Sequence, residues 1–155
     1  MADTVFTMVN TFVLPFWLLL IVAPHSKATK LLVHSGLVPV LLGSVYLFYI
    51  VGAFAFGPAD GGNLGSLDGL QQAFSNKETL VGAWVHYLVF DLFVGAWMAR
   101  DAKRHRIHHF AIVIPLLLTF MAGPFGLLLY VALKGFWIRQ FSLLENVAEP
   151  AISTH

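Results

Sequence analysis

The chain has 155 residues, of which 58% are hydrophobic and only 11% are charged, and its mean hydropathy is +0.78. These values lie far from the averages of water-soluble domains and indicate a single domain whose solvent is lipid. A formal net charge of +1 leaves no extended basic surface for nucleic acid, and the absence of Cys excludes disulfides, thiol nucleophiles and Cys-ligated metals.

Apolar segments long enough to cross a bilayer occur four times along the chain. A spanning helix needs about 20 mainly apolar residues, and short connections between such helices favour an antiparallel arrangement. We therefore predict an all-α membrane protein, an antiparallel bundle of four transmembrane helices that forms one domain over residues 1–155. The N-terminus lacks a basic n-region, so we do not expect a cleaved signal or transit peptide. The predicted spans are Val5–Ala23, Leu31–Phe56, Leu80–Ala99 and Phe110–Leu133.

The loops between the predicted spans differ in composition. The first and third are short and basic, whereas the second, residues 57–77, is rich in glycine and is a candidate lid. Because Lys and Arg concentrate in cytoplasmic loops, we expect both termini and the Gly-rich loop on the non-cytoplasmic side. The basic residues of the first and third loops are Lys27, Lys30, Arg100, Lys103, Arg104 and Arg106, against Lys77, Lys134 and Arg139 on the other side.

The third predicted span carries two ionisable side chains at membrane depth. With a rise of about 1.5 Å per residue, Asp91 lies roughly 12 Å and His86 about 20 Å from the cytoplasmic end of the helix. An ionisable group in hydrocarbon costs a few kcal/mol, so it is a candidate functional group. Asp91 is either a proton donor or a structural carboxyl that joins helices. His86 is either an acid–base or ligand group, or a neutral imidazole hydrogen-bonded inside the bundle.

Helical spacing places Trp84, Tyr87, Asp91 and Gly95 on one face of this span, whereas His86 points roughly 140° away from Asp91. One helix therefore presents its ionisable groups to two different neighbours.

Three polar or aromatic residues of the other spans lie at matching depths. The same rise places Thr119 and Trp17 near the level of Asp91, and Ser44 near the level of His86. We expect these side chains to be the partners of the two ionisable groups.

The third loop combines three histidines, His105, His108 and His109, with several Lys and Arg residues. No acidic or Cys residue completes a metal-binding spacing, and the neighbouring cations disfavour a bound metal. We predict no metal site, and we interpret this cluster as an anchor at the lipid headgroups.

Four motifs within the predicted membrane region carry a resemblance to a known family. They are Leu14-Pro15-x-Trp17; Pro24 with Thr29-Lys30; Trp84-x-His86-Tyr87-Leu88-x-Phe90-Asp91-Leu92-x-x-Gly95-x-Trp97-x-x-x-Asp101; and Pro115-x-Leu117-Leu118-Thr119-Phe120-x-x-Gly123-Pro124-x-Gly126-Leu127-Leu128-x-Tyr130. With these motifs the chain resembles the neoxanthin-synthase-like family, bacterial and plastid relatives of the plant abscisic-acid-deficient protein required for neoxanthin formation. The third motif is the specific one, because its spacing inside one apolar helix is unlikely to recur by composition alone.

The resemblance implies a carotenoid substrate and an isomerase. In the plant members, an epoxycarotenoid is isomerised so that one epoxide opens and an allene forms, which requires no redox cofactor. This chemistry needs a proton donor for the epoxide oxygen and a base for a carbon-bound proton in a dry site. On this basis Asp91 is the expected acid and His86 the base or its relay. The expected substrate contacts are Trp17, Ser44, Trp84, Tyr87, Phe90 and Thr119.

The resemblance also implies an integral protein of a bacterial inner or photosynthetic membrane or of a plastid membrane, with carotenoid and lipid as partners. The alternative is a non-catalytic pigment-binding subunit, accessory to a photosynthetic reaction-centre or antenna complex.

A haem or chlorophyll carrier would use His34 and His86, but their depths differ by roughly 10 Å or more, which disfavours a bis-His haem. A proton or ion pathway at Asp91 has only one membrane carboxylate to build on.

Overall fold

The computed structural model describes residues 1–56 and 62–139, and all regular structure within them is helical, which confirms the all-α class. The elements are α1 (Ala2–Val22), α2 (Lys27–Thr29), the π-helical turn η1 (Lys30–His34), α3 (Leu37–Phe56), α4 (Leu67–Ser75), α5 (Lys77–Arg104), α6 (His109–Ala122) and α7 (Pro124–Ile138). The predicted Gly-rich loop thus contains a short helix, α4, while residues 57–61 lie outside the described part.

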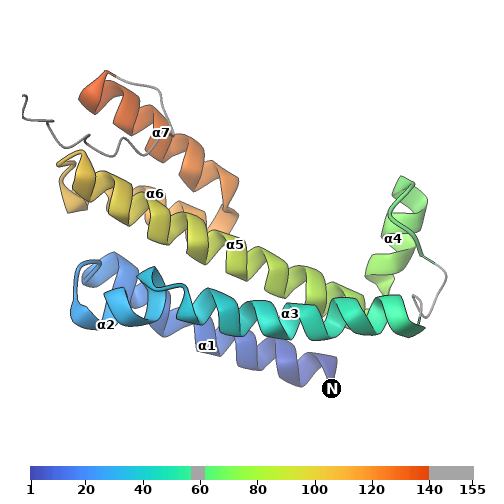
Figure 1. Ribbon diagram of the computed structural model, residues 1–155. Coiled ribbons are helices and arrows are strands. Elements are labelled where there is room, and N and C mark those ends of the chain that lie inside the picture. The colour runs from blue at the N-terminus through green and yellow to red at the C-terminus, as the bar shows by residue number, and fades with distance from the viewer. Residues whose placement is uncertain (57–61, 140–155) are drawn as a thin grey trace, which may run out of the picture.

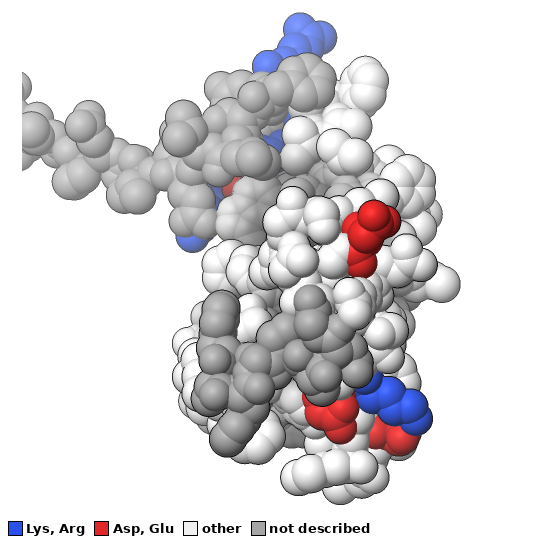
Figure 2. All heavy atoms as spheres, turned by 90° about the vertical axis from the view of Figure 1, so that its right-hand side faces the viewer, with Lys and Arg blue, Asp and Glu red and all other residues white. Residues whose placement is uncertain are grey.

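Three helical segments are long and apolar enough to cross a membrane, counted over the described residues. They are Ala2–Val22, the run Lys27–Gly52 that joins α2, η1 and α3, and Lys77–Arg104. These segments correspond to the first three predicted spans. In the view from the α4 end (Figure 2), most of the described side chains are uncharged, and a few acidic and basic residues lie among them.

Helix α5 contacts both of the other long helices, α1 and α3, and all three run along the long direction of the molecule (Figure 1). α1 runs parallel to it, because Lys77 Nζ lies 3.0 Å from the Asp3 carboxylate and Trp84 Nε1 donates to Asn10 Oδ1 at 3.1 Å. α3 runs antiparallel to α5, with Tyr49 packed against Gly82 near one end. This arrangement makes α5 the helix against which the candidate site is built.

The predicted fourth span, Phe110–Leu133, is not one continuous helix, which corrects the four-helix antiparallel bundle. The chain reverses between α6 and α7, where Gly123 has φ 32° and Pro124 begins α7. At Gly126 the two helices meet so closely that a Cβ would lie 2.1 Å from Thr119 Oγ1. With 14 and 15 residues, the two helices are each about 21–23 Å long, shorter than the hydrocarbon core of about 30 Å. They form a hairpin against the second half of α5 (Figure 1).

A buried ion pair joins the end of this hairpin to α5. Lys134 Nζ lies 2.7 Å from Asp101 Oδ2, and the Tyr130 hydroxyl donates to the same oxygen at 2.6 Å. Both charged residues are at most 1% exposed. The Tyr130 ring packs edge-on against Trp97, 5.6 Å between centroids, and the Lys134 ammonium lies 6.0 Å from the Trp97 ring centroid. The pair holds α7 beside the last third of α5.

This pairing corrects the predicted position of Lys134, which we expected at the opposite end of the bundle. α7 ends at the same end of the molecule as α5, so eight of the nine Lys and Arg residues lie at that end, and Lys77 lies at the other. The charge asymmetry is therefore stronger than the sequence indicated. The described chain thus begins at the Lys77 end and reaches Arg139 at the opposite end, so the two ends of its described part do not share one side. The side of the membrane that each end faces stays a prediction, and residues 140–155 lie outside the described part.

We predict that replacing Lys134 with Met destabilises the fold by about 3–5 kcal/mol, because it leaves the Asp101 carboxylate buried without its cation. The double variant Lys134→Met/Asp101→Asn should recover most of this loss, since no uncompensated charge remains. Thermal unfolding in detergent micelles measures both effects. Lys77→Met, which removes an exposed ion pair, serves as the control with the smallest change. Equal losses in Lys134→Met and Lys77→Met would contradict a structural role for the buried pair.

Candidate ligand site around Asp91

Asp91 lies in the middle of α5, where the tip of the α6–α7 hairpin meets that helix. The residue is 7% exposed, and its carboxylate packs directly against Gly123. A Cβ at position 123 would lie 2.5 Å from Asp91 Oδ1, so the contact and the positive φ both require glycine there. Asp91 Oδ2 is buried without a hydrogen-bond partner among the described residues. This oxygen can therefore interact with a ligand without breaking a bond within the protein.

The hairpin tip itself is fixed by Thr119. Its hydroxyl donates to the Pro115 carbonyl at 2.8 Å, and its carbonyl accepts the Gly123 N–H at 2.9 Å. Gly123 is also the N-cap of α7, so the Asp91 carboxylate lies beside the positive end of that helix dipole. Thr119 therefore shapes the site from behind, and its hydroxyl is already used inside α6.

Trp17 forms one wall of the site from α1. It is 2% exposed, and its ring lies so close to Gly95 that a Cβ there would be 2.8 Å from Cη2. The ring centroid of Phe120 lies 5.4 Å away. α1 and α5 run parallel with their N-terminal ends aligned. Trp17 therefore lies near the depth of Asp91, as the sequence predicts. Its indole Nε1 is buried and has no hydrogen-bond partner among the described residues.

A row of aromatic rings, Phe6, Trp84 and Tyr87, leads along α1 and α5 to Asp91, and we call it the aromatic ledge. Tyr87 lies one turn before Asp91 and their side chains interact. The Trp84 centroid lies 5.3 Å from that of Tyr87 and 5.6 Å from that of Phe6. Trp84 and Phe6 are 37% and 42% exposed, because the hairpin covers α5 only beyond Asp91. The ledge is therefore accessible from the lipid side.

The structure separates His86 from Asp91. His86 is exposed on another face of α5, where its ring lies 5.3 Å from that of Tyr46 and 4.6 Å from that of Phe90. Phe90 is 55% exposed, and Ser44 is exposed with its hydroxyl donating to the Val40 carbonyl at 3.0 Å. The site thus brings together Asp91, Tyr87, Trp84, Trp17 and Thr119 of the predicted residues. It does not include His86, Phe90 or Ser44.

Both ring nitrogens of His34, the candidate axial ligand, have protein partners. Nε2 donates to the Pro24 carbonyl at 2.8 Å, and Nδ1 accepts from an Arg100 guanidinium nitrogen at 3.3 Å. This histidine therefore links the first turn to α5, and neither ring nitrogen is available to coordinate a haem or chlorin. A carrier of that class gains no support from this geometry.

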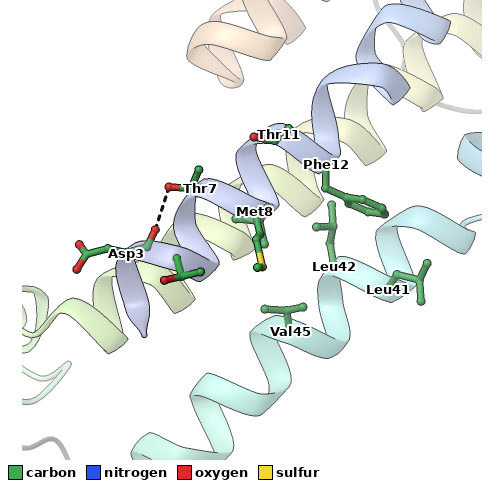
Figure 3. Close-up of a pocket in the computed structure, with 10 residues that line it drawn as sticks. Asp3, Thr7, Met8, Thr11, Phe12, Leu41, Leu42 and Val45 are labelled. Carbon is green, nitrogen blue, oxygen red and sulfur yellow. Dashed lines mark hydrogen bonds between the residues drawn. The ribbon is translucent and has the colours of Figure 1, made fainter.

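A groove of about 1020 Å³ lies between α1 and α3 (Figure 3). Helical spacing places its Thr4 and Thr11 on the side of α1 opposite to Phe6 of the aromatic ledge. Hydropathy does not report where two helices diverge, so this groove could not be predicted from the residues alone. Its remaining lining is Asp3, Thr7, Met8, Val9, Phe12, Leu41, Leu42 and Val45.

These features define an all-α protein with three candidate membrane-spanning helices and a hairpin whose tip covers a buried carboxyl. The sequence model of the ABA DEFICIENT 4-like family matches residues 4–130, from α1 into α7. The chain therefore belongs to the ABA DEFICIENT 4-like family, which confirms the resemblance carried by its motifs.

A relative from Arabidopsis thaliana, Protein ABA DEFICIENT 4, chloroplastic, is 32% identical over 111 residues. The match covers 68% of this chain and 50% of the relative, so the chain spans about half the length of the curated relative it matches. No solved structure matches the chain.

We predict that Gly123→Ala destabilises the protein by about 1–3 kcal/mol, because alanine is strained at φ 32° and its Cβ would collide with Asp91. Gly43→Ala is the matched control, since a Cβ there meets nothing within 4 Å and alanine favours a helix. Thermal unfolding of the two variants in detergent measures the difference. A Gly123→Ala protein as stable as Gly43→Ala would contradict the close packing of the tip on α5.

Proposed function

We propose that the protein binds a carotenoid at the aromatic ledge and isomerises it by acid–base chemistry at Asp91, without a redox cofactor. The observation that carries this proposal is the buried Asp91 carboxyl with an unpartnered oxygen, at the end of a row of rings open to lipid. Membership of the ABA DEFICIENT 4-like family supports the substrate class. We place the protein in a carotenoid-containing membrane of a plastid or a bacterium.

The ledge has the chemistry that a polyene requires. A carotenoid is flat and apolar, and aromatic rings offer such a molecule large contact areas. Trp84 lies seven residues before Asp91, which corresponds to about 10 Å along the helix. A polyene that lies on Phe6, Trp84 and Tyr87 therefore presents its ring end to the carboxyl. Because the ledge opens to lipid, the substrate reaches it without crossing water.

The proposed reaction uses one carboxyl twice. Hydrocarbon favours the neutral carboxylic acid, so Asp91 has a proton to donate. It protonates the epoxide oxygen as one C–O bond breaks, and the resulting carboxylate then takes a proton from a polyene carbon to form the allene. Atoms balance, no electrons are transferred, and the acid is regenerated. Since His86 lies on another face of α5, we assign the base to Asp91 and leave His86 the role of a relay at most.

We predict that Asp91→Asn lowers conversion of an epoxycarotenoid at least about 100-fold, because an amide can neither donate nor accept the required proton. His86→Gln should keep most of the activity if Asp91 performs both steps. Both variants are expressed in a carotenoid-producing host, and products are separated by chromatography and normalised to the amount of protein in the membrane. Full conversion by Asp91→Asn would overturn the assignment of the acid.

The second candidate function is non-catalytic pigment binding, as an accessory subunit of a photosynthetic pigment–protein complex. The groove between α1 and α3 favours it, because its volume of about 1020 Å³ accommodates a large apolar ligand and neither Asp91 nor His86 lines it. On this alternative the pigment occupies the groove and the chemistry at Asp91 is irrelevant.

We predict that a carotenoid co-purifies with the protein and is lost in Trp84→Ala, which removes the central ring of the ledge. Leu41→Trp, which fills the groove instead, should retain it. Absorption spectra of the purified variants, with pigment extracted and counted per chain, decide between the two sites. Loss of pigment in Leu41→Trp together with retention in Trp84→Ala would favour the accessory-subunit function.

A further inference from the structure

A pocket of about 340 Å³ lies at the end of the molecule where α5 ends and α6 begins, far from the aromatic ledge. Its rim consists of His25 from the turn after α1, Lys103 at the end of α5, Arg106 in the turn that follows, and His108 and His109 at the start of α6. We call it the basic pocket. None of the described residues that line it is acidic.

The electrostatics of the basic pocket favour an anion. Burial, followed by the neighbouring Lys103 and His109, holds the pKa of His25 below its ordinary value. The rim groups therefore repel one another. Asp101, the buried carboxylate nearest to them in the chain, is held by Lys134 at 2.7 Å and does not line the pocket.

The backbone contributes in the same direction. His108 is the N-cap of α6 and makes no side-chain capping bond, so the first turn of this helix directs N–H groups and the positive end of its dipole to the pocket. The preceding turn places Arg106 at φ 55°, a conformation uncommon for a residue other than glycine. The Ile107 N–H bonds to the Ala102 carbonyl at 2.9 Å and fixes this turn.

The floor of the basic pocket is apolar. Ala99, Ala102, Ile107 and Ile112 line it and are each at most 5% exposed. His109 donates from Nε2 to the Ile21 carbonyl at 2.7 Å, which leaves its Nδ1 buried without a partner among the described residues. A cationic rim above an apolar floor matches a phosphate group that is attached to hydrocarbon better than it matches a free ion.

We propose that the basic pocket binds the phosphate group of an anionic phospholipid, taken from the leaflet in which the basic loops lie. Free phosphate is the other source of the same chemistry. The site is independent of the proposed carotenoid chemistry, because none of its residues belongs to the aromatic ledge or contacts Asp91.

The full chain, purified in a neutral detergent, is titrated with dihexanoyl phosphatidylglycerol, with dihexanoyl phosphatidylcholine and with inorganic phosphate, and thermal unfolding is followed. We expect a saturable rise in Tm with phosphatidylglycerol only. Lys103→Gln and Arg106→Asn should each raise its half-saturating concentration about fivefold, since a basic group near a lipid surface contributes about 1 kcal/mol. Asparagine is chosen at position 106 because it tolerates a positive φ.

Lys27→Gln is the matched control, since it removes an exposed charge from the same end of the molecule without touching the pocket. Lys103→Arg keeps the positive charge and should bind phosphatidylglycerol as the unmodified protein does, which excludes a general effect of substitution at this position. An unchanged half-saturating concentration in both pocket variants, or an equal shift in Lys27→Gln, overturns the site. A rise in Tm with inorganic phosphate equal to that with phosphatidylglycerol overturns the lipid as its source.

Discussion

The ion pair between Asp101 and Lys134 fixes the register of the hairpin against α5, and the geometry of the candidate site depends on that register. Ten residues separate Asp91 from Asp101 on α5, and eleven separate Gly123 from Lys134 on α7. Because both helices rise by about 1.5 Å per residue and run in the same direction, pairing at one end brings the tip to Asp91 at the other. A charge buried among apolar side chains must keep its partner, so alternative registers of α7 are strongly disfavoured.

The hairpin is a reversal of the backbone at membrane depth, and such reversals are tolerated only where protein covers them. Two glycines meet this condition in different ways. Gly123 adopts a positive φ and lets the Asp91 carboxylate approach the turn, whereas Gly126 lets α7 pack on Thr119 and Pro115 of α6. A larger residue at position 123 would separate the tip from α5, and one at position 126 would separate α7 from α6. The same close packing that buries Gly123 therefore also buries the carboxyl.

The sequence predicts those features that depend on local properties of one helix. Three spans, the level of Trp17 and the angle between His86 and Asp91 follow from hydropathy and helical geometry, and the structure agrees with each of them. The reversal at Gly123-Pro124 was not predicted, because the residues on both sides of it are apolar and read as one span. Lys134 was assigned to the wrong end, since its partner lies 33 residues earlier and only tertiary packing reveals it. Which neighbour covers each face of α5 is likewise a tertiary property, and so His86 was expected inside.

The two buried carboxyls of α5, Asp91 and Asp101, show how the fold separates stability from chemistry. Asp101 Oδ2 accepts a hydrogen bond from Tyr130 and forms an ion pair with Lys134. Both partners belong to α7, so this carboxylate serves to hold α7 in place. The start of α6 is held separately, by the bond from His109 to the Ile21 carbonyl of α1. With both ends of the hairpin fixed in this way, the tip keeps its place without a hydrogen bond to Asp91 Oδ2. Asp101 Oδ1 is also buried without a hydrogen-bond partner among the described residues, but His105 Nε2 lies 3.5 Å from it and Lys134 compensates the charge on Oδ2. Asp91 has no such cation beside it in the described part of the chain, so its unpartnered oxygen stays free for a ligand.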